Sequence, residues 1–210
     1  MQVRRTFSAS RAWRPAVGAG LTRTLGVMKS TSLSSFVLQI RAERRLWSEV
    51  PGFDPKNGNE QAKYLLVLEA PGPKAVKSGY VTFDNPDLTA ANLKAQLEAA
   101  GVNRGDIAVW NVVPWYLGNE DQTRIRAAER EDVALGIAYL LRLVRLLPNL
   151  RCIVLVGAAA RKAHVSLSAA TTARILSCHH TSPRVMKPAS SAANENIAVL
   201  KRMQHARHDA

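Results

Sequence analysis

Three polar residues that can take part in proton transfer or ligand binding follow apolar runs in the sequence. Glu69 comes directly after one run, Asn111 lies near the end of a second, and His180 comes shortly after a third. A carboxylate, an amide and an imidazole can together move protons, donate and accept hydrogen bonds, and stabilise developing charge. We therefore take these three residues as the first candidates for a functional site.

The apolar runs that carry them have the character of buried parallel strands. Four such runs occur, at 64–68, 107–113, 151–157 and 173–178, and helical patterns lie between them. Strands that are apolar on both faces and alternate with helices predict a parallel sheet between two helical layers. The predicted fold is therefore α/β, a three-layer α/β/α sandwich with a central four-stranded parallel sheet.

In open sheets of this kind, ligands bind outside the carboxyl ends of the strands. Because Glu69, Asn111 and the His179/His180 pair all follow strand ends, we expect them to meet at one edge of the sheet. His179 should point to the opposite face from His180 and have a structural role.

The segments between the strands also carry recognisable signals. Helical spacing is expected around 33–47, 133–147 and 192–204, in the small-residue segment after the third strand, and after Asn85, which together with Pro86 resembles a helix start. The segment from Glu69 to Asn85 is long, polar and rich in Gly and Pro, so we expect a functional loop.

Length and composition indicate one domain with a basic extension. The chain has 210 residues, of which 47% are hydrophobic. Residues 1–30 are rich in Arg and small residues, so we expect a disordered extension or a transit peptide, unless translation starts at Met28. Residues 31–210 are expected to form a single domain. The apolar runs are shorter than the roughly 20 residues that cross a bilayer, so no membrane partner is expected.

The net charge of +13 predicts an anionic partner. Seven Lys and Arg residues precede Glu43, the first acid, and from Arg151 onwards nine Lys and Arg residues stand against two acids. The last part of the fold should therefore face the polyanion. Charge alone does not choose between DNA, RNA and an acidic membrane surface.

The two cysteines, Cys152 and Cys178, lie in strand-like runs and are interpreted as core thiols. A cluster held by four cysteines is excluded by this count. We expect no metal and no cofactor.

Four motifs in order resemble those of the uracil-DNA glycosylase superfamily: EAPGP, WNVVPW, VGAAA and HTSP, between Tyr64 and Met186. The first is most similar to the Glu-x-Pro-Gly branch, which carries an iron–sulfur cluster, whereas this chain lacks that branch's cysteines. The resemblance implies a DNA-repair glycosylase that flips uracil out of DNA and hydrolyses its N-glycosidic bond, leaving an abasic site. Its partner would be uracil-containing DNA.

The resemblance also implies roles for residues around the base. His180 matches the family's His-x-Ser-Pro histidine, which would donate a hydrogen bond to uracil O2 as negative charge develops. Asn111 would pair with uracil O4 and N3–H, a pattern that cytosine does not offer. Phe83 would stack on the flipped base, and Tyr80 is close enough in sequence to exchange roles with it.

Glu69 would orient or activate the water and stabilise the cationic sugar. This role comes from the Glu-x-Pro-Gly branch alone, because the best-known branch has an Asp one position later, where this chain has Ala70 in the substrate-binding motif. The alternative for Glu69 is a structural carboxylate that accepts hydrogen bonds from loop amides.

DNA contacts are expected after the last strand. Ser182 and Pro183 would hold a phosphate, and Lys187 would add a second contact that weakens with salt. Arg184 stands where relatives insert a wedge into the duplex, so it would either act as the wedge or bind phosphate. Thr181 replaces the proline usual in this motif.

No lysine stands at a motif position where it would form a Schiff base, so a monofunctional enzyme is expected. Two alternatives stay open: a catalytically weakened DNA-binding protein of the same fold, and a glycosylase for another deaminated base. The protein is expected to be a monomer in a bacterial cytoplasm, or in mitochondria if the N-terminus is a transit peptide.

Overall fold

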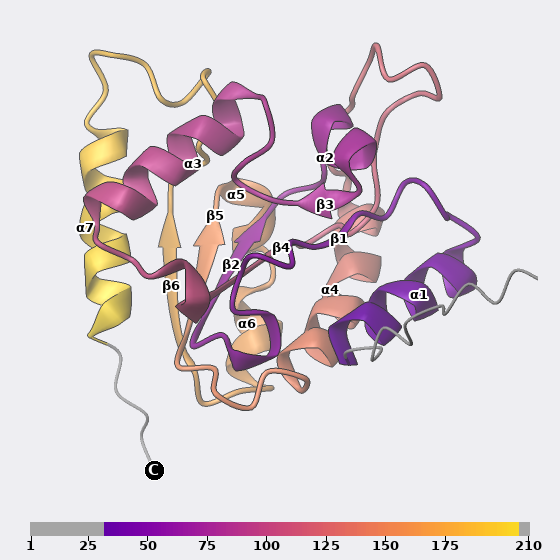
Figure 1. Cartoon of the computed structure of the whole chain (residues 1–210), viewed down its shortest axis with the longest axis horizontal. Helices are drawn as coiled ribbons and strands as arrows, with labels where there is room; N and C mark the ends of the chain where they lie inside the picture. The colour runs from indigo at the N-terminus through magenta and orange to yellow at the C-terminus, as the bar shows by residue number, and fades with distance from the viewer. Residues whose placement is uncertain (1–31, 206–210) are drawn as a thin grey trace, which may run out of the picture.

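The computed structural model describes residues 32–205. Its centre is a sheet of four parallel strands in the order β4-β2-β5-β6 (Figure 1). The strands are β2 (Tyr64–Leu68), β4 (Ile107–Asn111), β5 (Cys152–Val156) and β6 (Arg174–Cys178). The prediction of a four-stranded parallel sheet is confirmed. The predictions for residues 1–30 lie outside the described residues.

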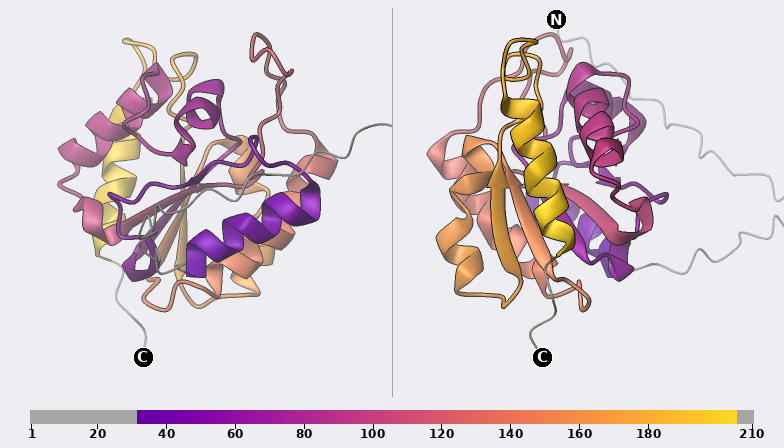
Figure 2. Two further views of the ribbon diagram at one scale, coloured as in Figure 1. Left: turned by 45° about the vertical axis from the view of Figure 1, so that its right-hand side comes forward. Right: turned by 90° about the vertical axis from the view of Figure 1, so that its left-hand side faces the viewer.

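Helices cover both faces of this sheet. The helices are α1 (Ser32–Arg44), α2 (Pro73–Ser78), α3 (Leu88–Ala99), α4 (Arg130–Val144), α5 (Ala158–Arg161), α6 (His164–Ser168) and α7 (Ala192–Gln204). In Figure 2, α3 and α7 lie together on one side of the sheet, and α5 and α6 lie on the other. The predicted α/β/α sandwich is therefore the observed architecture.

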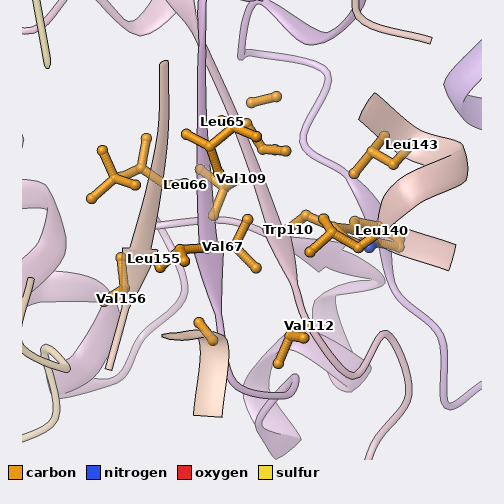
Figure 3. Packing of buried hydrophobic residues seen from close by; sticks show 14 of the residues in the cluster. Leu65, Leu66, Val67, Val109, Trp110, Val112, Leu140, Leu143, Leu155 and Val156 are labelled. Carbon is orange, nitrogen blue, oxygen red and sulfur yellow. The ribbon is translucent and has the colours of Figure 1, made fainter. Parts of the chain in front are cut away.

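The core lies between these layers because the strands are apolar on both faces. Leu65, Leu66 and Val67 are fully buried, and they belong to β2, which lies between β4 and β5 (Figure 3). Trp110 of β4 stacks on Phe53, with ring centroids 4.3 Å apart. This packing fixes the ends of β2 and β4 relative to each other.

Two local predictions were wrong. Asp87, not Asn85, caps α3, because its side chain accepts a hydrogen bond from the Ala90 amide at 2.9 Å, while Asn85 donates to the Tyr80 carbonyl. The small-residue helix after β5 is also divided into α5 and α6. The amides of Lys162 and Ala163 bond three residues back, which tightens the chain and ends α5.

The segment expected to be a loop between Glu69 and Asn85 contains α2 and a short strand, β3 (Tyr80–Val81). β3 pairs in parallel with β1 (Gly52–Phe53). These elements bring the chain back beside the sheet and carry Phe83 to the carboxyl ends of the strands.

The two cysteines are free and buried, as expected for core thiols. Burial raises the pKa of the Cys152 thiol to about 11 and that of Cys178 to about 12. None of the helices between residues 32 and 205 is long and apolar enough to span a bilayer.

Candidate functional site

The register of the sheet brings the first two candidates to the same edge. Leu68 of β2 is paired with Asn111 of β4, and the Val113 amide donates to the Glu69 carbonyl at 2.9 Å. On the other side of β2, the end of β5 is paired with Cys178 of β6, so His180 also lies beyond this edge.

Glu69, Asn111 and His180 line a cavity of about 600 Å³. The candidates in its wall are Glu69, Ala70, Phe83, Asn111, His180 and Arg184. Tyr80 is 44% exposed and lies outside the lining, as do Ser182, Pro183 and Lys187. The structure thus brings together Phe83, Asn111, His180 and Glu69, to which the resemblance gives base-binding and catalytic roles, and it leaves Tyr80 outside the cavity.

Asn111 presents an unused donor to this cavity. The residue is 3% exposed, and its Nδ2 atom has no hydrogen-bond partner among residues 32–205. A buried amide donor without a partner loses free energy relative to water, so such groups are rare unless a ligand completes them. The position of Asn111 is therefore suited to a ligand that carries an acceptor.

His180 is held in one tautomer by its own loop. The Ser182 amide donates to His180 Nδ1 at 3.1 Å, so Nδ1 is the acceptor and the proton of the neutral ring lies on Nε2. Burial lowers the pKa of His180, while the negative charge of Glu69 opposes that shift. A neutral imidazole is thus presented with Nε2–H as donor, and no described residue accepts from it.

The Glu69 carboxylate has a structural contact. Its Oε1 atom accepts a hydrogen bond from the Ala128 amide at 2.9 Å, which attaches the segment before α4 to the end of β2. Its Oε2 atom has no hydrogen-bond partner in the described part of the chain, so that oxygen is available to a water or a ligand. The loop-amide contact expected as the alternative for Glu69 is present, and it leaves half of the carboxylate unused.

Phe83 is fixed from behind by Arg104, a residue that sequence reasoning missed. The Phe83 side chain is 6% exposed, and the Arg104 guanidinium lies 4.4 Å from its ring centroid. Arg104 is held in turn by Asp54 at 2.6 Å and Asp84 at 2.8 Å. Hydrogen bonds from Arg104 and then Lys94 hold the pKa of Asp84 down at about 2. The ring is therefore held in a fixed position beside the cavity.

The segment after β6 is ordered without the usual proline. Thr181 is fully buried, and its carbonyl accepts a hydrogen bond from Asn92 of α3 at 2.9 Å. His179 is structural, as expected, because its amide donates to Asn196 of α7 at 2.8 Å and its ring lies 2.7 Å from Glu195. The 179–187 segment, which carries the predicted DNA contacts, is thus attached to both helices on its side of the sheet.

A second stretch of the cavity wall was not anticipated. Ile125, Arg126 and Ala127 come from the segment between β4 and α4 and line the cavity beside the candidates. The only sequence signal here is an apolar residue between two arginines in a polar segment. Within the described chain, no three His, Cys, Asp or Glu side chains are grouped so that they could hold a metal ion.

Comparisons with known proteins identify a family and a similar solved structure. The family model described as the uracil DNA glycosylase superfamily matches residues 55–204. Among solved structures, the solution NMR structure of a candidate uracil DNA glycosylase from Methanosarcina acetivorans is similar, with 17% identity and a TM-score of 0.46. The match covers 70% of this chain and 93% of that one. No curated protein matches the chain.

Proposed function

Since the chain belongs to the uracil DNA glycosylase superfamily, we propose that it removes uracil from DNA as a monofunctional, cluster-free glycosylase. One observation carries this proposal: the buried donor Asn111 Nδ2 and the half-buried donor His180 Nε2–H lack partners within residues 32–205 and belong to one cavity with Phe83. A flat heterocycle with two carbonyl oxygens could accept a hydrogen bond from each of these donors and stack on the ring of Phe83.

In this proposal the flipped uracil stacks on Phe83. Asn111 donates from Nδ2 to uracil O4 and accepts from N3–H through its amide oxygen. Cytosine has an amino group in place of O4 and lacks the N3 proton, so it would leave both amide groups of Asn111 mismatched. A buried mismatch of this kind costs about 1–3 kcal/mol per group.

His180 then acts on the leaving base. As the bond between N1 and C1′ breaks, its electron pair moves into the uracil ring, and Nε2–H donates to the oxygen that gains charge. A neutral donor in a fixed position needs no reorganisation during the reaction, and one such donor contributes about 10²- to 10³-fold in rate.

Glu69 faces the other product of bond cleavage, the cationic sugar. Its unpartnered Oε2 would orient a water for attack on C1′ and accept a proton from it, while the negative charge stabilises the cation. The bond from Oε1 to the Ala128 amide keeps the carboxylate in place. The uracil anion takes up a proton from solvent, and Glu69 returns its proton to solvent, so the products are free uracil and an abasic site in DNA.

The test uses uracil-containing oligonucleotides, single-stranded and duplex, incubated with the protein in EDTA and then treated with alkali to break abasic sites. We expect strand breaks at uracil, a loss of at least about 100-fold in His180→Ala, and no loss in the control His164→Ala, an exposed histidine on α6. Intact DNA binding with no cleavage of either substrate would refute the enzyme and favour a DNA-binding protein.

The base reader is tested separately. Asn111→Asp replaces the Nδ2 donor with an acceptor, so the preference for uracil over cytosine should fall. Cleavage of uracil and cytosine substrates by the variant gives the ratio directly. A ratio equal to that of the wild type would contradict the role of Asn111.

A further inference from the structure

The segment between β4 and α4 presents an apolar side chain at the mouth of the cavity. We call residues 117–127 the 117–127 loop. Ile125 of this loop is 53% exposed, yet it lines the same cavity as Asn111 and His180. The position of this exposed side chain at the cavity mouth distinguishes it from an ordinary surface aliphatic residue.

The backbone that carries Ile125 is braced across the loop. Gly118 and Ile125 form an antiparallel bridge, and the Asn119 amide donates to the Arg124 carbonyl at 3.1 Å. In return, the Arg124 amide donates to the Asn119 side chain at 2.8 Å. The backbone at Ile125 is therefore held in position before any partner binds, so binding would involve little further ordering of the loop.

The base of the loop is attached to the candidate active site. The Ala128 amide donates to Glu69, and Arg126 forms an ion pair with Asp132 of α4. Gly118 allows Tyr116 to pack beneath the loop, because a Cβ at position 118 would lie 2.0 Å from the Tyr116 hydroxyl oxygen. The end of the loop is thus connected directly to the carboxylate of Glu69.

The loop has a counterpart across the sheet edge. In Figures 1 and 2, the 117–127 loop and the segment between β6 and α7 both rise beyond the carboxyl ends of the strands, on opposite sides. Arg184 lines the cavity from the second of these segments, and Ile125 lines it from the first. A strand whose nucleotide enters the cavity would therefore pass between an arginine and an aliphatic side chain.

We propose that Ile125 is the side chain that inserts into duplex DNA beside the flipped nucleotide. Inserted wedges are typically apolar, and Ile125 is the exposed aliphatic residue at the cavity mouth, whereas Arg184 is charged. Arg184 then binds phosphate. This inference rests on the proposed function, because it assumes a flipped nucleotide in the cavity.

The charges of the 117–127 loop favour DNA contact near Ile125 and disfavour DNA contact at the tip of the loop. The Arg124 guanidinium has no ion-pair partner in the described part of the chain and stands next to Ile125, where it would contact a phosphate. Glu120 and Asp121 at the tip would be repelled by the DNA backbone. The DNA therefore lies over the side of the loop that faces the cavity.

The experiment compares Ile125→Ala with the wild type on a duplex and on a single strand of the same sequence containing uracil. Val165→Ala is the matched control, because Val165 is an aliphatic residue of α6 that is 80% exposed and outside the cavity lining. We expect kcat/KM of Ile125→Ala to fall about tenfold or more on the duplex and to stay within about twofold of the wild type on the single strand, where no stack needs a wedge.

Binding gives a second readout that does not depend on catalysis. The probe is a duplex with a tetrahydrofuran abasic analogue and a neighbouring 2-aminopurine, whose fluorescence rises when it is unstacked. We expect the wild type and Val165→Ala to raise the fluorescence on binding, and Ile125→Ala to bind more weakly and raise it less.

The outcomes separate this inference from the proposed function. If the wild type cleaves uracil DNA but Ile125→Ala matches it on the duplex in rate and fluorescence, the wedge is refuted and the glycosylase stands. If the wild type cleaves only single strands and unstacks no duplex, the wedge is also refuted. If the wild type cleaves nothing, the proposed function fails, and the fluorescence assay still decides whether Ile125 inserts into DNA.

Discussion

Gly157 lies against the imidazole of His180. A Cβ built on Gly157 would stand 3.0 Å from the Cβ of His180 and 3.1 Å from its Cδ2, and the backbone of Gly157 has φ +91° and ψ 175°. Because Gly157, the last residue before α5, has no side chain, the side chain of His180 can occupy the space beside it. The glycine of the VGAAA motif therefore makes room for the His180 side chain at the site.

Gly157→Ala should therefore damage both stability and activity. The backbone conformation is one that glycine alone adopts readily, and strain of this kind costs about 1–3 kcal/mol. We expect the free energy of unfolding in urea to fall by about that amount and uracil excision to fall because His180 is displaced. Gly52→Ala is the control, since its added Cβ makes only an ordinary contact at 3.8 Å. Equal stability of both variants would contradict the strain at Gly157.

The lowered pKa of His180 predicts a pH dependence of stability. The unfolded chain protonates this histidine near its ordinary pKa of 6.5, whereas the folded chain protonates it at lower pH. Stability contributed by His180 is therefore present above pH 6.5 and is lost as the pH falls below it. The difference in unfolding free energy between wild type and His180→Gln, measured in urea from pH 8 to about pH 5, should decrease. A difference that grows towards acid would mean that the pKa is raised instead.

Two substitutions of Glu69 separate its chemical and structural roles. Glu69→Gln keeps a side-chain oxygen that can accept from the Ala128 amide but removes the charge, whereas Glu69→Ala removes both. We expect Glu69→Gln to retain its stability and lose about 100-fold or more in single-turnover rate. Glu69→Ala should in addition speed hydrogen exchange at the Ala128 amide. Full activity in Glu69→Gln would leave Glu69 with the structural role alone.

Phe83 and Tyr80 make a matched pair for the stacking role. Phe83 lines the cavity and Tyr80 does not, so Phe83→Leu should raise KM and lower kcat/KM about tenfold or more. Tyr80→Leu should remain within about twofold of the wild type. Steady-state kinetics on a single-stranded uracil substrate measure both effects. Larger losses in Tyr80→Leu would show that the two residues exchange roles when DNA binds.

The sequence predicts the central sheet well because its strands are short apolar runs that end in polar residues. Asn111 and His180 follow such runs, and the rule for parallel sheets is enough to place them at one edge. The cap of α3 was assigned two residues early because Asn85 and Asp87 are both good capping residues. Only the three-dimensional position of Tyr80, whose carbonyl receives the Asn85 amide, distinguishes them.

The residues that surround the candidate site were harder to predict from the sequence. Arg104 reaches Phe83 from a turn before β4, and no spacing in the sequence links the two residues. Ile125 was overlooked because an aliphatic residue in a polar loop carries no periodic signal, and its importance comes from the cavity that other segments build. Contacts between distant segments of this kind depend on packing, which local patterns do not encode.

Asn196 of α7 holds the backbone of His179, and the ribosome makes α7 after all the motifs of the site. The Asn196 side chain bonds both the amide and the carbonyl of His179, at 2.8 and 3.0 Å, and also the side chain of Gln96. A growing chain that has left the ribosome as far as the HTSP motif, just beyond β6, carries every motif of the site but not α7, which holds the residue before that motif in place. We expect activity to emerge only when α7 has been made, so nascent chains would stay inert towards DNA until then.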